Sequence, residues 1–244
     1  MTRPRRAAAG LIAGSFLVMA PLGLLTVGAG ASTSSGSGSG SGSGKAPSLA
    51  QARKDLLVLS DMPAGWTSTK NPNANDNSSL GNKQLAHCIG VSSSLIAENP
   101  PSVYSPQFQS SDGTLTVADN VALFPSAKNA TAEYGIGSNP KFPSCLTALA
   151  SGPLKAKLFG KLPKGTTIGT PLVSAVATSA LAPGISGYSL SVPVTAQGVT
   201  LNVTVTQLIT VKGRLGHQVT FTSAGAPFSL AVEQQIMKVA AARL

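Results

Sequence analysis

The stretch that decides the fold is residues 188–221, which read YSLSVPVTAQGVTLNVTVTQLITVKGRLGHQVTF. Apolar and polar residues alternate through it with a period of two, and most of the polar positions are Ser or Thr. Gly198 and Gly213 interrupt the alternation and mark two turns. This pattern is typical of antiparallel strands that bury one face and expose the other. The stretch therefore predicts an antiparallel meander, in which Pro193 indicates an edge position or a bulge.

Further elements flank this meander. Residues 104–111 and 114–124 read as two strands joined by a turn at Asp112-Gly113. Other segments have helical composition or periodicity, and they are residues 48–59, 83–88, 92–97, 126–134, 144–149 and 228–244. The last of these is expected to cover the apolar face of the sheet. Strands with helices packed on one face predict an α+β fold with an antiparallel sheet.

The N-terminal region predicts export. Arg3, Arg5 and Arg6 precede an uncharged run that ends in Ala29-Gly30-Ala31, a small-x-small cleavage pattern. Residues 1–31 are therefore a signal peptide or, because the run is long enough to cross a bilayer, an uncleaved membrane anchor. Both alternatives place the rest of the chain outside. Residues 32–46 form a Gly/Ser-rich flexible linker, and residues 47–244 form one extracellular domain.

The composition argues against several classes of function. Two His and two Cys leave little room for a metal cluster, and seven Phe, three Tyr and one Trp are few for a surface that stacks bases or sugars. The sequence has no P-loop, G-x-G-x-x-G, H-E-x-x-H or G-x-S-x-G motif. We therefore expect no cofactor, no metal and no catalytic residues, with a hydrolase as the third alternative.

The two cysteines, Cys88 and Cys145, predict a disulfide, because the domain lies in an oxidising compartment. A reactive thiol beside His87 is the alternative. A bridge between them would stabilise the fold by roughly 4 kcal/mol in the loop-entropy estimate.

One histidine is predicted to point into the core. His217 shares the parity of its apolar neighbours, and Gln207 lies on the apolar parity of the preceding strand. If residues 212–214 form a three-residue turn, Ile209 lies opposite His217 and Gln207 lies diagonal to it. A hydrogen bond between Gln207 and His217 would then satisfy both side chains.

Asp119 also falls on an apolar parity, so it either joins this polar spot or is turned outward by a bulge. His217, Gln207 and Asp119 together are a candidate ligand pocket. The alternative is a buried histidine whose hydrogen bonds are satisfied within the core.

Positive charge is concentrated after the predicted helix at residues 144–149. Without the three N-terminal arginines, 15 basic and 8 acidic residues leave a net charge of +7. Lys155, Lys157, Lys161 and Lys164 form a candidate patch for anionic lipid or an anionic wall polymer. A solvated surface is the alternative. We expect no nucleic acid as a partner, because the domain is extracellular and poor in Arg.

An ordered set of short motifs resembles a known family. The motifs are DMPAGW at 61–66, HCIG at 87–90, VALFPSA at 121–127, FPSCL at 142–146, RLGHQV at 214–219 and ARL at 242–244. Together they resemble actinobacterial exported proteins related to the extracellular sensor domain of the mycobacterial PknH-type serine/threonine kinase. The resemblance implies a curved sheet with a cleft beside it, and ligand sensing at the envelope rather than catalysis. The family domain has more than one disulfide, whereas this chain has Cys for one, and we expect no kinase domain in it.

These observations predict an exported cell-envelope protein that acts as a non-enzymatic ligand-binding or sensor-like module. Its ligand would be an unknown small molecule or an envelope component. The alternative is a structural envelope protein that associates with anionic lipid or wall polymer.

Overall fold

The computed structural model describes residues 47–72, 74, 82–92, 100–152, 164–176, 181 and 184–244. The predicted signal peptide or anchor, the linker and most of the predicted helical turn at 92–97 lie outside these residues. Within the described ranges, no helix has the length and apolar character needed to cross a bilayer.

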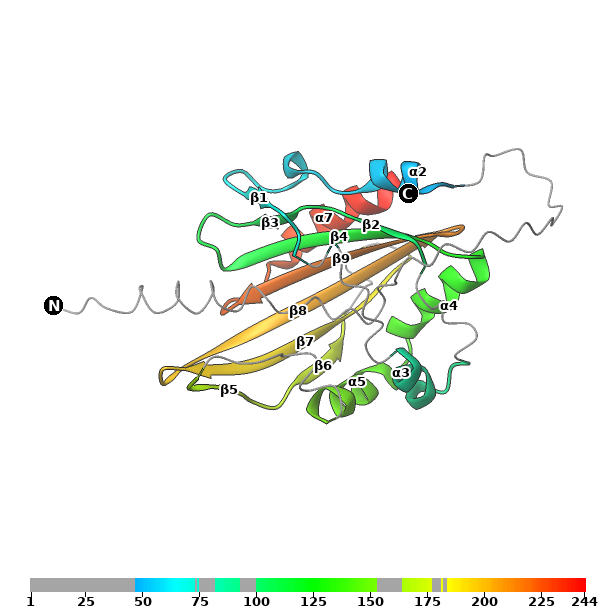
Figure 1. The fold of residues 1–244 in the computed structure, drawn as a ribbon. Helices are drawn as coiled ribbons and strands as arrows, with labels where there is room; N and C mark the ends of the chain where they lie inside the picture. Colours follow the sequence, from blue (N-terminus) through cyan, green and yellow to red (C-terminus); the bar gives the residue numbers. More distant parts are fainter. Residues whose placement is uncertain are drawn as a thin grey trace, which may run out of the picture.

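An antiparallel sheet of nine strands forms the centre of the described domain (Figure 1). Its main path runs in the order β1 (Thr67–Thr69), β3 (Gln107–Gln109), β4 (Leu115–Leu123), β9 (Leu215–Ala224), β8 (Val199–Lys212), β7 (Ile185–Ala196) and β5 (Thr166–Ile168). Two short strands lie off this path: β2 (Ser102–Tyr104) pairs with β4, and β6 (Leu172–Ala175) pairs with β7. The α+β class with an antiparallel sheet is therefore confirmed.

The predicted meander is β7–β8–β9, and its two turns fix the register. Gln197 and Gly198 both have positive φ, which suits a two-residue turn that matches the twist of the strands. The second turn also has two residues, because Lys212 pairs with Leu215. His217 consequently lies opposite Thr210, and Gln218 lies opposite Ile209. The prediction of a three-residue turn at 212–214 is wrong, because the turn is one residue shorter.

The helices lie on both faces of the sheet, whereas the sequence predicted one face. We call the first the α7 face, which is covered by α2 (Leu49–Asp55) and α7 (Leu230–Arg243). The second is the α4 face, which is covered by α3 (Asn82–Ile89), α4 (Ala127–Gly137) and α5 (Phe142–Ser151).

Strand β8 shows why both faces need a cover. Leu208 and Ile209 are adjacent, so their side chains point to opposite sides of the sheet. Leu208 packs in the cluster under α7, and Ile209 packs in the cluster on the other side. Two apolar neighbours in an otherwise alternating strand therefore indicated a sheet buried on both faces.

Local signals set the ends of the helices. Ser48, Ser126 and Ser229 cap α2, α4 and α7, because each hydroxyl accepts a backbone N–H three residues later. The predicted helix at 48–59 ends at Asp55, and a short 3₁₀ turn, η1 (Leu59–Asp61), follows. The predicted strand at 104–111 is divided into β2 and β3, with Pro106 between them.

Candidate functional site

The structure brings two of the three predicted pocket residues together. His217 Nε2 lies 2.6 Å from Asp119 Oδ2, and both side chains are fully buried on the α7 face. The His217 Nδ1–H donates to the carbonyl of Ala240 in α7 at 3.2 Å, since a carbonyl oxygen can only accept. The Leu57 N–H donates to Asp119 Oδ2 at 3.1 Å. This pair therefore joins the sheet to α7 and to the segment after α2.

Gln207 does not belong to this group, and the predicted Gln207–His217 hydrogen bond is wrong. The two-residue turn shifts the register, so Gln207 faces the α4 side of the sheet. There it lies opposite Tyr188, whose hydroxyl donates to Gln207 Oε1. Burial raises the pKa of the Tyr188 phenol, which keeps it a neutral donor.

The disulfide is present as predicted. It joins Cys88 of α3 to Cys145 of α5, with 5.9 Å between their Cα atoms. It therefore ties together two of the helices that cover the α4 face. His87, the neighbour of Cys88, is exposed.

The predicted lysine patch cannot be assembled from the described residues. Lys155, Lys157 and Lys161 lie outside them, and Lys164 is exposed just before β5.

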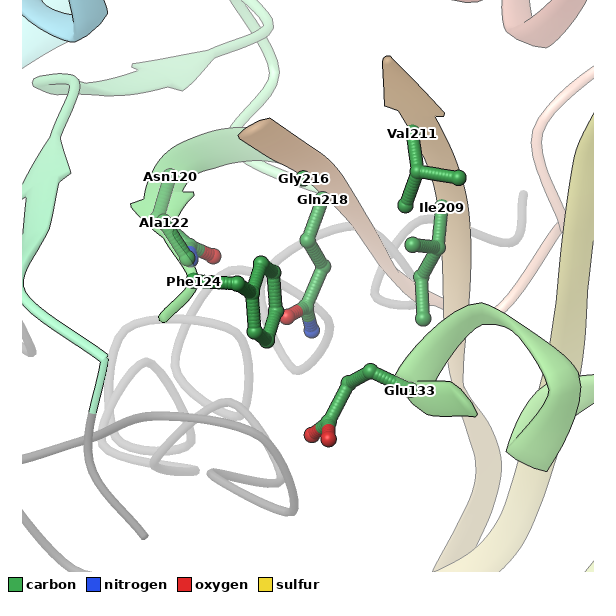
Figure 2. A pocket seen from close by; sticks show the side chains of 8 residues that line it. All are labelled: Asn120, Ala122, Phe124, Glu133, Ile209, Val211, Gly216 and Gln218. Carbon is green, nitrogen blue, oxygen red and sulfur yellow. The ribbon is translucent and has the colours of Figure 1, made fainter. Parts of the chain in front are cut away.

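A pocket that sequence analysis missed lies between α4 and the sheet (Figure 2). Its cavity volume is about 20 Å³. The empty volume is about 280 Å³ when the space open to solvent is included. The lining residues are Asn120, Ala122, Phe124, Glu133, Ile209, Val211, Gly216 and Gln218.

Two rows of paired residues form the floor of this pocket. Asn120, Gln218 and Ile209 lie side by side across β4, β9 and β8, and Ala122, Gly216 and Val211 form the next row. All of them point to the α4 face, because side chains at alternate positions share a face.

Phe124 forms a wall beside the floor. A Cβ atom at position 216 would lie 2.6 Å from Phe124 Cε2, which is too close. The Phe124 ring can lie where it does because residue 216 is glycine. The backbone of Phe124 is fixed as well, since its N–H donates to the Arg214 carbonyl and its carbonyl accepts from Arg214 Nε.

Helix α4 supplies the only ionisable group among these lining residues. Ala130, Glu133 and Ile136 follow at three-residue spacing along the buried side of the helix, so Glu133 is directed inward. Ser186 Oγ donates to the carbonyl of Tyr134 at 3.0 Å and holds the helix on β7. Figure 2 shows Glu133 extending from α4, while Phe124 and Gln218 extend from the sheet side.

Glu133 is buried without a compensating partner. The residue is 3% exposed, and its Oε2 has no hydrogen-bond partner among the residues that the structure describes. Desolvation raises the pKa of its carboxyl to about 8, so the group is mostly protonated at neutral pH. A signal for this site was present in the sequence, because Glu133 is one of only eight acidic residues and lies on an apolar helix stripe.

Comparison with known proteins gives a structural similarity but no sequence match. No family profile matches the sequence, and no curated protein matches it. Among solved structures, the chain is similar to the crystal structure of the extracellular domain of PknH from Mycobacterium tuberculosis. The TM-score is 0.39 and the sequence identity 12%, over 82% of this chain and 97% of that chain. A similarity of this size transfers neither ligand nor activity.

Proposed function

We propose that the protein is an exported, non-enzymatic small-molecule-binding module of the cell envelope, and that its ligand enters the pocket beneath α4. The observation that carries this proposal is the buried Oε2 of Glu133, which has no partner and borders the pocket. An unsatisfied buried polar group costs about 1–3 kcal/mol. A ligand that donates a hydrogen bond to this oxygen would recover that free energy.

The residues around the pocket favour binding over catalysis. The lining described above contains no Ser, Thr, Cys, Lys or His, so it offers no side chain of the usual nucleophile types besides the carboxyl. His217 is a poor general base for a substrate, because both of its ring nitrogens are engaged under α7. We therefore propose the pocket on the opposite face as the ligand site, in place of the one predicted at His217, Gln207 and Asp119.

Two features support export in this proposal. The N-terminal residues have the charge and apolar pattern of a signal peptide or anchor. The disulfide between Cys88 and Cys145 is of a kind that persists in oxidising compartments.

A pair of matched variants tests the location of the site. Ala122→Leu places a larger side chain in the floor of the pocket, whereas Ala118→Leu changes the same strand on the same face outside the lining. The full exported protein is titrated with a mixed set of small amines, alcohols, amides and carboxylates, and the side-chain amide NMR signals of Asn120 and Gln218 are followed.

We expect at least one of these compounds to shift both amide signals in the wild type and in Ala118→Leu, but not in Ala122→Leu. Thermal melts of both variants establish that they are folded. The proposal is wrong if no compound shifts these signals, or if Ala122→Leu responds like the wild type.

A further inference from the structure

The ligand class can be inferred from the charges and hydrogen-bonding groups around Glu133. We propose that the pocket binds the ammonium group of a small primary aliphatic amine, with the Glu133 carboxylate as its counter-ion. This inference rests on the proposed function, because it assumes that the pocket is the ligand site. The argument uses the described residues around the pocket, their charges and their polarity.

The first step is the charge around Glu133. From β4, β8 and β9, the residues that face α4 at the pocket are uncharged: Asn120, Ala122, Ile209, Val211, Gly216 and Gln218. From β7, the titratable group on this face is Tyr188, which donates its hydroxyl to Gln207. The described cations near these residues in sequence are outside the lining: Lys128 of α4 and Lys212 are exposed, and Arg214 Nε donates to the Phe124 carbonyl. No described cation therefore lies in the pocket lining, and a cationic ligand would supply one.

The second step is the match of hydrogen-bonding groups. A primary ammonium has three N–H donors and no acceptor. Glu133 Oε2 needs a donor, and the side-chain amides of Asn120 and Gln218 bring carbonyl oxygens to the same pocket. One ammonium group can therefore bond the carboxylate and still find further acceptors.

The third step is the apolar part of the lining. The ring of Phe124 can attract a cation through its π-face. Ile209 and Val211 provide apolar surface for an alkyl chain. The cavity volume is about 20 Å³, and a cavity of about 10–15 Å³ on the same measure is enough to hold one water molecule. A primary ammonium therefore fits this space better than a bulky quaternary ammonium.

The fourth step is the proton balance. Glu133 holds a proton at neutral pH, because desolvation raises its pKa to about 8. When the ammonium binds, the carboxyl O–H bond breaks, the proton passes to solvent and a carboxylate–ammonium pair remains. Each binding event thus releases about one proton at pH values below about 8. The affinity should rise about tenfold for each pH unit until this pKa is reached.

Isothermal titration calorimetry on the full exported protein tests the inference with n-butylammonium chloride as the probe. n-Butanol and sodium butyrate are matched in length but differ in charge, and tetramethylammonium chloride is the bulky cation. Repeating the titration in buffers of different ionisation enthalpy counts the protons released. We expect n-butylammonium to bind at least about tenfold more tightly than the other probes, with about one proton released near pH 7.

Two variants separate the carboxyl charge from the shape of the site. Glu133→Gln should weaken n-butylammonium binding at least about tenfold and abolish proton release. Glu233→Gln is the control, because burial raises the pKa of Glu233 to about 7 but this residue lies on α7, on the other face. Its binding should equal that of the wild type. If Glu133→Gln does not fold, the proton release and pH dependence of the wild type still decide the question.

Failure of this inference can be told from failure of the proposed function. If n-butanol or butyrate binds and shifts the Asn120 and Gln218 amide signals while n-butylammonium does not, the ligand class is wrong but the pocket remains the site. If no probe binds, the amine inference is overturned, and the Ala122→Leu comparison decides separately whether the pocket binds anything.

Discussion

The two faces of the sheet each bury a carboxyl group, and the two groups differ in their partners. Asp119 on the α7 face bonds His217 through its Oδ2 and receives the Leu57 N–H on the same oxygen. Each group has one buried oxygen without a partner among the described residues, Asp119 Oδ1 and Glu133 Oε2, but of the two only Glu133 borders the pocket. Both residues are only 3% exposed. Burial and one unpaired oxygen therefore do not tell a structural carboxyl from one available to a ligand, whereas the hydrogen bonds at Asp119 Oδ2 and the pocket beside Glu133 do.

The contacts that hold the helices in place also differ between the two faces. On the α7 face, polar contacts join the helices to the sheet, and Arg243 donates to Asp61 at the end of α7. On the α4 face, one polar contact, from Ser186 to the Tyr134 carbonyl, holds α4 on β7, and a disulfide joins α3 to α5. Each attachment can be removed by substitution, which gives tests of both sides of the comparison.

The largest expected effect concerns the pH dependence of Glu133. Its pKa is about 8 in the fold and about 4.5 in the unfolded chain, so the unfolded chain loses the proton first. Stability should therefore fall as the pH rises from about 4.5 to about 8, by on the order of 5 kcal/mol from this group, and level off above. Glu133→Gln should lack this loss and be more stable than the wild type at about pH 8.5, as measured by urea unfolding.

The Glu233→Gln variant is the control for that experiment, since the raised pKa of Glu233 adds a slope of the same sign. It should retain the part of the pH dependence that belongs to Glu133. Equal pH profiles for the wild type and Glu133→Gln would contradict the comparison.

The next effect is the loss of the paired carboxyl on the α7 face. Asp119→Ala leaves His217 Nε2 and the Leu57 N–H without their partner, and removing one member of a buried pair costs about 3–5 kcal/mol. Urea unfolding at about pH 6 should show this loss, whereas Glu133→Gln at the same pH should be more stable than the wild type by roughly 2 kcal/mol. A loss below about 1 kcal/mol would mean that the pair does not anchor this face.

Removal of the disulfide should come third. The double variant Cys88→Ser/Cys145→Ser should lose about 2–4 kcal/mol, chiefly because the unfolded chain gains freedom. Thermal unfolding of the oxidised wild type and of the variant measures the difference. Two thiols that react with a labelling reagent in the unreduced exported protein would contradict the bridge.

The smallest effect should follow from Arg243→Ala. Arg243 pairs with Asp61 at 2.7 Å and donates to the Leu56 carbonyl, but the pair is partly exposed. Partly exposed ion pairs contribute about 1 kcal/mol or less, so this variant should be far milder than Asp119→Ala. A loss of stability as large as that of Asp119→Ala would mean that the Arg243 contacts at the end of α7, rather than the buried Asp119–His217 pair, hold the α7 face.

Local patterns in the sequence were sufficient for much of the fold. The period-two stretch predicted the meander, Ser126 predicted the start of α4, and two cysteines in a chain that was predicted to be exported indicated the bridge. Each of these depends on neighbouring residues or on the compartment, so no knowledge of the packing was needed.

The site was harder to predict, because it depends on register and on layers. A turn shorter by one residue placed Gln207 and His217 on opposite faces, since side chains alternate along a strand. Asp119 was placed correctly beside His217 as one of two alternatives. Glu133 was missed because its burial arises from a second helical layer, which the sequence analysis had assigned to the other face.

The central claim is that the Glu133 carboxyl is protonated in the free protein and loses its proton when a cationic ligand binds. Carbon NMR of the labelled glutamate carboxyls, titrated with and without n-butylammonium, tests it most directly. The signal absent in Glu133→Gln should titrate near pH 8 in the free protein, and this midpoint should fall when the amine is present. A midpoint near the ordinary 4.5, or one that the amine leaves unchanged, would contradict the claim.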